Sequence, residues 1–499
     1  MKIGDLSLNI MLINPRIPVY LRMPSMPLGL VSIASYLNGH GHRAIIIERS
    51  IKTYDMRAEI RRFQPDVIGV SVMSFLSGID AKKLTQKLRK LTDVPVIWGG
   101  QAPSASPEMV LRDGAPDYVM LGEGELTWLA VADALEKKEP LEGIEGLAFL
   151  RDGAFVSNPI RPVADLFRFP EMDWTLVEPK KYFSTFFHCG KMLYLHASKG
   201  CPAACIFCSN NQYHQSCNRC RDPKHVLDDI DRFVLDYGAD GIYFSDELFV
   251  PRRDLRTQLC EGLIERGYDL VWGCQMRLGV LKEEDVQLMA RAGCRWILFG
   301  IESGSKERID AIKKKINLDL AYQTVEWCEK AGITVQASFI IGFPGETPEE
   351  MQKTVDFAER LPASLIAMNI LTPIPNSEIW DLWDRDFPQY KKPGSIRACA
   401  RQVEQNVGDL VPWNFSKVST RELRVVHYHY QWKDFSDKGS VNQDSYGILK
   451  KMAQDAFNRI FRHGLSGFIF GTYTSVKQFC TVFFYSHFFP RILKKYHLK

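Results

Sequence analysis

The chain has 499 residues, of which 45% are hydrophobic and 24% are charged, with a formal net charge of +4. This length and apolar content suit two or three domains with separate cores and exclude a chain that is disordered throughout. The first residues, MKIGDLSLNIMLINP, lack the apolar run and cleavage site of a secretory signal, so we expect a cytoplasmic protein. The twelve cysteines are therefore expected to be reduced thiols rather than a disulfide framework.

Residues 1–140 alternate short apolar segments with helical patterns of suitable length. The expected strands lie near Ile10, Ile45, Val67, Pro95 and Tyr118. This alternation predicts an α/β domain with a doubly wound parallel sheet of the flavodoxin or Rossmann type. Ligands of such sheets bind beyond the carboxyl ends of the strands, so the loops at that edge indicate the ligand.

Those loops are rich in glycine, which allows a bulky planar ligand to approach the backbone closely. A flavin or nucleotide is one candidate, because the Gly-Gly pair at Gly99 and Gly100 is a weak signal alone. However, no G-x-G-x-x-G follows the first strand, and the chain has no Gly-Lys-Ser/Thr phosphate loop. The usual dinucleotide and nucleoside triphosphate sites are therefore disfavoured.

The stretch KGCPAACIFCSNN carries Cys201, Cys205 and Cys208 in a C-x3-C-x2-C spacing. A structural zinc site would require a fourth nitrogen or sulfur ligand. A [4Fe–4S] cluster held by three thiolates instead leaves one iron free to bind a substrate or cofactor. Three buried cysteines without a metal are the simpler alternative.

An apolar strand at Met192 to Ala197 precedes these cysteines, and a regular strand and helix alternation follows them. The later strands are expected to begin near Gly241, Leu270, Trp296, Val335 and Leu365. Six parallel strands predict a partial (β/α)6 barrel over residues 186–390, with the cysteines at the carboxyl ends, where such barrels form active sites. Residues 141–185 are expected to be a linker, and residues 391–499 a mainly helical C-terminal region.

This order of motifs resembles the cobalamin-dependent radical S-adenosylmethionine (SAM) enzymes, in which a cobalamin-binding domain precedes a radical SAM domain. The resemblance implies that Cys201, Cys205 and Cys208 ligate a [4Fe–4S] cluster whose open iron binds SAM. The residues that it implies for SAM binding are Asp246, Glu247, Arg277, Glu302, Gly342 and Gly345. The residues that it implies for cobalamin binding are Pro27, Leu28, Gly29, Ser71, Gly99, Gly100, Gly122, Glu123 and Gly124. Capping of the next helix is an alternative role for Glu247.

The resemblance also implies a reaction. One SAM methylates cob(I)alamin, a second is cleaved to a 5′-deoxyadenosyl radical, and methylcobalamin delivers a methyl group to an unactivated substrate carbon. Oxidative cyclisation or rearrangement without methyl transfer is an alternative, and a non-catalytic cobalamin-binding or electron-transfer protein is another. An external donor such as flavodoxin or ferredoxin would reduce the cluster. No catalytic residue beyond the cofactor ligands is assigned.

Two departures from the family pattern limit what can be transferred. Many relatives have Pro-Gly-Thr where this chain has Pro375, Asn376 and Ser377, so no substrate is carried over. Classical cobalamin domains supply a histidine to the cobalt after the first strand, where this chain has Asn14-Pro15-Arg16. We therefore expect no histidine as the lower cobalt ligand. The neighbouring His40 and His42 belong to an expected helix-ending turn.

Seven of the nine remaining cysteines fall into two groups. Cys217 and Cys220 form a C-x2-C pair that fits a surface loop better than a second metal site, for which Cys189 and His214 would be the nearest partners. The other five are expected to be small core residues: Cys260, Cys274, Cys294, Cys328 and Cys399.

The last 44 residues, 456–499, contain seven Lys or Arg and no Asp or Glu. They also contain a dense run of Phe and Tyr, interrupted by Lys477, Gln478 and His487. This composition favours a segment at an anionic membrane surface over a spanning helix, and it would suit an apolar substrate such as a lipid, polyprenoid or tetrapyrrole. A lid over the active site is the alternative. Nucleic acid is not expected as a partner, because the basic charge is confined to this tail.

Overall fold

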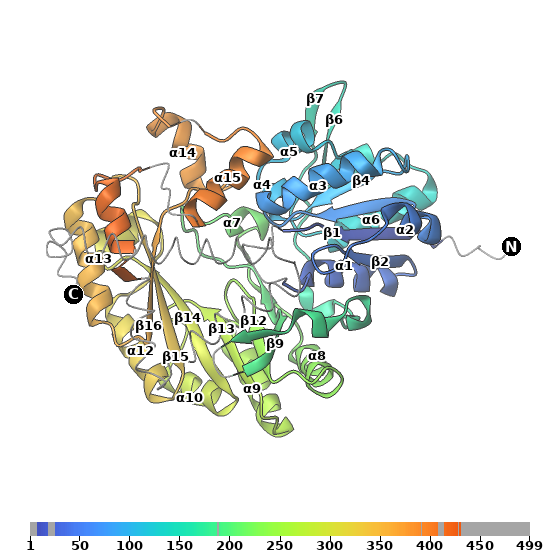
Figure 1. Cartoon of the computed structure of the whole chain (residues 1–499). Helices are drawn as coiled ribbons and strands as arrows, with labels where there is room; N and C mark the ends of the chain where they lie inside the picture. The colour runs from blue at the N-terminus through green and yellow to red at the C-terminus, as the bar shows by residue number, and fades with distance from the viewer. Residues whose placement is uncertain are drawn as a thin grey trace, which may run out of the picture.

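The computed structural model describes residues 7–17, 25–186, 189–390, 392–407, 414–427 and 429–430. Within these ranges the chain forms two seven-stranded sheets, each flanked by helices, and a small two-stranded sheet (Figure 1). The predicted α/β class, with a doubly wound sheet followed by a partial barrel, is confirmed. The basic aromatic segment predicted at 456–499 lies outside the described residues.

The first sheet has the strand order β2-β1-β3-β4-β5-β6-β7. Its parallel strands are β1 Asn9–Asn14, β2 Arg43–Glu48, β3 Val67–Ser71, β4 Val96–Gly99 and β5 Tyr118–Met120. Its helices are α1 Leu28–Gly39, α2 Met56–Phe63, α3 Phe75–Leu88, α4 Gln101–Ala105, α5 Pro107–Gly114 and α6 Glu125–Lys137. The strand order reverses between β1 and β3, so a ligand site is expected beyond the carboxyl ends of these two strands.

Residues 141–185, expected to be a linker, contribute to both parts of the molecule. β6 Leu147–Arg151 and β7 Ala154–Ser157 extend the first sheet as antiparallel strands. The segment also contains four 3₁₀ helices: η1 Leu141–Gly143 before β6, and η2 Leu166–Arg168, η3 Trp174–Leu176 and η4 Pro179–Tyr182 after β7. Trp174 is buried and donates its indole N–H to Asp229 of the barrel part at 2.6 Å, while the Asp173 amide donates to Ser35 of α1 at 2.8 Å. The segment therefore fastens the two parts together.

The second sheet has the order β16-β15-β14-β13-β12-β9-β8. Its six parallel strands are β9 Cys189–Leu195, β12 Gly241–Phe244, β13 Val271–Met276, β14 Cys294–Glu302, β15 Thr334–Ile341 and β16 Leu365–Ile370, and β8 Ser184–Phe186 is antiparallel. Its helices are α8 Pro223–Leu235, α9 Arg253–Arg266, α10 Glu283–Arg291, α11 Lys306–Ala311, α12 Asp319–Lys330 and α13 Pro348–Arg360. The end strands β8 and β16 do not pair with each other in the described residues, which makes this sheet the predicted partial barrel.

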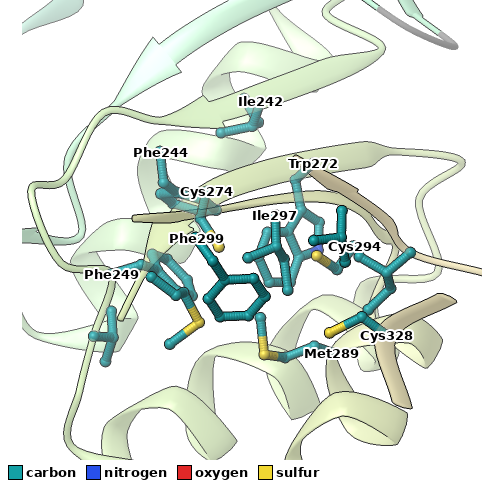
Figure 2. Packing of buried hydrophobic residues seen from close by; sticks show 14 of the residues in the cluster. Ile242, Phe244, Phe249, Trp272, Cys274, Met289, Cys294, Ile297, Phe299 and Cys328 are labelled. Atoms are coloured by element: carbon teal, nitrogen blue, oxygen red, sulfur yellow. The ribbon is translucent and has the colours of Figure 1, made fainter. Parts of the chain in front are cut away.

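The barrel core contains buried thiols among aromatic side chains. Figure 2 shows Cys274, Cys294 and Cys328 in a cluster with Trp272 and Phe299. These cysteines, together with Cys260 and Cys399, are free and buried, which confirms the prediction that they are core residues. Burial raises the pKa of the Cys260 thiol to about 12, so this group stays neutral and acts as a small apolar side chain.

Two further helices, α14 Glu378–Asp386 and α15 Ile396–Val407, follow the barrel and lead the chain back to the first domain. Figure 1 shows α15 beside α3. The Ile396 amide donates to Asp113 at 3.1 Å, and Ile396 belongs to the same buried cluster as Trp98 of β4. Among the helices that the structure describes, none combines the length and the apolar character required to cross a bilayer.

Candidate active site

A cavity of about 420 Å³ opens between the carboxyl ends of the two parallel sheets. Asn14 and Ser71, at the ends of β1 and β3, line one side, whereas Tyr194 and Ser245, at the ends of β9 and β12, line the other. A smaller cavity of about 60 Å³ adjoins it within the first domain and shares Gly29, Ser71 and Gly124 with it. The site therefore lies at the strand edges that both sheet topologies predict.

All nine residues predicted to contact cobalamin line one or both of these cavities. The larger cavity includes Pro27, Leu28, Gly29, Ser71, Glu123 and Gly124, and the smaller includes Gly29, Ser71, Gly99, Gly100, Gly122 and Gly124. Gly100 has φ +107°, and a Cβ atom there would lie 2.8 Å from the carbonyl oxygen of Val72. Only glycine fits this backbone. The smaller cavity, called the slot below, is therefore lined by main-chain atoms at the edge of the sheet.

Cys201, Cys205 and Cys208, here called the cysteine triad, lie on one loop after β9, the triad loop. Cys205 is buried, Cys201 and Cys208 are partly exposed, and none forms a disulfide. The loop is fixed from the barrel side, because the Ile206 amide donates to the Ile312 carbonyl at 3.2 Å. The Phe207 ring packs 5.8 Å from the Phe343 ring. Three thiols on one loop suit an iron–sulfur cluster. In the described part of the chain, no three His, Cys, Asp or Glu side chains lie close enough together to hold a metal ion as they stand.

Arg277 and Glu302 converge on the neighbourhood of this loop. Glu302 ends β14 with φ +72°, and its carboxylate lies 2.8 Å from the Lys314 ammonium. Arg277 donates to the backbone carbonyls of Lys314 and Lys315. Burial raises the pKa of the Cys205 thiol, while the positive charges of Lys314 and Arg277 oppose this rise.

Asp246 and Glu247 occupy different environments. Asp246 is completely buried, and its carboxylate accepts hydrogen bonds from the amides of Ala197 and Ser198 at 3.0 and 2.7 Å. Its side chain therefore anchors the start of the triad loop, and direct contact with SAM stays a prediction. Glu247 lines the larger cavity, and its carboxylate accepts a hydrogen bond from the Gly200 amide at 2.8 Å. This partner precedes Glu247 in the chain and does not belong to the next helix, as helix capping would require.

The turn after β15 contains the last two predicted residues, Gly342 and Gly345. Both are in left-handed conformations, with φ +87° and +70°. The Glu346 carboxylate accepts hydrogen bonds from the amides of Gly342 and Phe343, and Phe343 packs on Phe207 beside Cys208. This turn is thereby linked to the triad loop.

Sequence reasoning did not identify Lys199, Lys314, Arg219 or His196 as site residues. Lys199 forms an ion pair of 2.6 Å with Glu125 of the first domain, and His196 lines the larger cavity. The partners of Lys199 and Arg219 lie 74 and 96 residues away in the sequence, so no local pattern marked these two side chains. Cys220 ends the short strand β11 Arg219–Cys220, which pairs with β10 Ser198–Lys199. Cys217 lies two residues before this strand.

Comparison with known proteins defines the class of enzyme. Residues 21–132 match the B12 binding domain model, and residues 195–358 match the Radical SAM superfamily model. An uncharacterized methyltransferase of Pyrococcus horikoshii is 29% identical over 71% of this chain and 78% of its own. An anaerobic magnesium-protoporphyrin IX monomethyl ester cyclase of Rubrivivax gelatinosus is 26% identical over 73% and 68%.

The fold is similar to that of the radical SAM methyltransferase TsrM from Kitasatospora setae, solved with cobalamin and a [4Fe–4S] cluster bound. The TM-score is 0.66 at 19% identity, covering 79% of this chain and 85% of that one. The two domains occur in the predicted order, so this protein is a radical SAM enzyme with a B12-binding domain. The chain belongs to the cobalamin-dependent radical SAM family, and its cofactors are a [4Fe–4S] cluster, SAM and cobalamin.

The substitution Gly29→Leu should weaken cobalamin binding by about tenfold or more, because a side chain would enter both cavities. A Cβ atom at Gly29 meets nothing within 4 Å, and leucine favours the helix α1, so the empty protein should fold. Gly143→Leu is the matched control, since this exposed position is also free of neighbours within 4 Å. Absorbance titration with cobalamin measures both, and equal affinities would contradict the assignment of this edge.

Proposed function

We propose that this protein transfers a methyl group from SAM to an unactivated carbon of a small-molecule substrate. The observation that carries the proposal is one continuous cavity between the edge of the B12-binding domain and the edge of the radical SAM barrel. A methyl carrier and a radical source must act on the same carbon, so both must reach one space. The similarity to a methyltransferase over most of both chains also supports this reaction.

Residues of the chain divide this task between the two sheets. Cys201, Cys205 and Cys208 would hold the cluster. Arg277 and Glu302 would position SAM beside it, and the glycine edge of the first sheet would hold the cobalamin. When bound, the cluster and SAM supply a radical that removes hydrogen from carbon, and cobalamin carries the methyl group. Apolar residues such as Met26, Leu28 and Met73 line the cavity and limit the water that could compete there.

Ring closure without methyl transfer is the second candidate, favoured by the similarity to a magnesium-protoporphyrin ester cyclase. A non-catalytic cobalamin-binding protein is less suited to the structure. Such a protein would not need Glu302 and Arg277 at strand ends beside Cys205, one of three free thiols on the same loop.

Incubation of the reconstituted, reduced enzyme with extracts and SAM labelled in its methyl group should yield a labelled product and 5′-deoxyadenosine. Replacing Cys201, Cys205 and Cys208 with alanine should abolish the labelled product, the 5′-deoxyadenosine and the iron–sulfur absorbance. The control Cys399→Ala, at a buried position of α15, should retain all three. Mass spectrometry separates the candidates. Formation of 5′-deoxyadenosine without label transfer would favour cyclisation, and neither product would favour a binding protein.

Cobalamin should bind without a histidine below the cobalt. Asn14 lines the cavity at the end of β1 and donates to Glu48 at 2.8 Å, and the lining histidines, His196 and His214, come from the barrel part. The electron paramagnetic resonance spectrum of bound cob(II)alamin should therefore lack superhyperfine splitting from an axial nitrogen. Clear nitrogen coupling would overturn this proposal.

We also propose that residues 456–499 attach the enzyme to anionic membranes, where an apolar substrate would be found, while a flavodoxin or ferredoxin reduces the cluster. Each basic residue near an anionic surface contributes about 1 kcal/mol, so binding should weaken with salt. Co-sedimentation with anionic and neutral liposomes should distinguish the full chain from one that ends at Asp455. Equal, negligible binding of both would exclude membrane attachment and favour a lid.

A further inference from the structure

A buried histidine, His214, lies between two carboxylates that belong to different domains. Its Nδ1 atom is 2.6 Å from Glu123 Oε1, and its Nε2 atom is 3.2 Å from Glu247 Oε1. Glu123 belongs to the turn between β5 and α6, and Glu247 follows β12. His214 itself follows the short helix α7 Asn210–Tyr213, and its side chain is only 4% exposed.

The contacts determine the charge of this ring. A carboxylate only accepts hydrogen bonds, so both ring nitrogens must donate and His214 must be an imidazolium. Burial disfavours the cation, but the hydrogen bonds to Glu123 and Glu247 outweigh it and raise the pKa of His214 to about 9. The same contact outweighs burial at Glu247 and lowers its pKa to about 2.

The surrounding charges balance only when His214 is protonated. Three carboxylates, Glu123, Glu125 and Glu247, meet two permanent cations. Lys199 is 2.6 Å from Glu125, and Arg219 donates to Glu123 at 2.9 Å. The imidazolium supplies the third positive charge. Tyr213 packs edge-on against the ring and stays neutral, because burial raises its pKa.

The hydrogen bonds of His214 to Glu123 and Glu247 connect the two edges of the cavity. Glu123 lies between Gly122 and Gly124, which line the slot of the first sheet. At the other end, Glu247 accepts from the amide of Gly200, the residue before Cys201. A continuous path of hydrogen bonds therefore runs from the glycine turn to the start of the triad loop.

We infer that His214 is a positioning residue that fixes the turn 122–124 relative to the loop beginning at Gly200, so that cobalamin binding and SAM binding influence each other. The inference rests on the two binding sites of the proposed function, but not on methyl transfer. Where binding at one site changes the affinity of another, the effect is reciprocal, and the factor is typically about 5 to 150. The coupling should be present at pH 7 and below and be lost as the pH rises through about 9, because the imidazolium is required.

The test is the dissociation constant of cobalamin, measured by absorbance titration of the anaerobically reconstituted full chain with and without saturating SAM. For the unsubstituted enzyme, SAM should change this constant about fivefold or more at pH 7 and hardly at pH 10. His214→Gln should bring the ratio close to one at every pH while iron content is retained. His225→Gln on α8 is the matched control and should keep the ratio and its pH dependence.

A second variant covers the case in which His214→Gln does not fold. Glu123→Gln keeps an acceptor oxygen but removes one charge, so the pH at which the coupling is lost should move from about 9 towards 6.5. An unchanged midpoint, or unchanged coupling in His214→Gln, would overturn the inference. If the unsubstituted enzyme binds cobalamin and SAM without coupling, only the inference about His214 is overturned. If it binds neither cobalamin nor SAM, the proposed function is overturned as well.

Discussion

The central constraint on this molecule is that two parallel sheets present their carboxyl ends to one cavity. Parallel sheets are covered by helices on both faces, so only these ends remain for ligands. Two such edges can face each other only if polar groups that become buried find partners. Lys199 contacts Glu125 and Arg219 contacts Glu123 across the domain boundary, and Ser32 of the first domain also donates to Glu125. Removing one partner of such a buried pair typically costs about 3–5 kcal/mol, so these contacts strongly favour one relative orientation of the sheets.

Local sequence patterns were sufficient for the parallel strands and for one side of the site, but not for β6 and β7 in the expected linker. Buried parallel strands are short apolar runs, so the five strands near Ile10 to Tyr118 and the six from Met192 onward could be predicted with their order. The glycine edge was also predictable, because a left-handed backbone such as that of Gly100 requires glycine whatever lies nearby in space. Its residues therefore carry their own signal.

The other side of the site depends on contacts between residues that are distant in the sequence. His214 meets Glu123, which lies 91 residues away, and Lys199 meets Glu125, which lies 74 residues away. A lysine or histidine that is ion-paired looks the same in a sequence as one that is solvated. Contact between Asp246 and SAM stays a prediction, and the structure adds that the carboxylate is fully buried and accepts hydrogen bonds from the amides of Ala197 and Ser198. Sequence alone could locate it at a strand end, but not give the direction of its side chain.

The charges beside the triad explain how this loop can suit an anionic cluster before one is bound. Burial raises the pKa of Cys205, which disfavours the thiolate that metal binding requires. Lys314 and Arg277 oppose this effect, whereas Glu302 adds to it, so the facing side chains carry one excess positive charge. Lys314 cannot simply turn towards solvent, because Glu302 holds its ammonium at 2.8 Å. Glu302 thus has two effects at this site: it keeps a cation near the thiols, and its own carboxylate remains at the strand end, where a bound ligand could meet it.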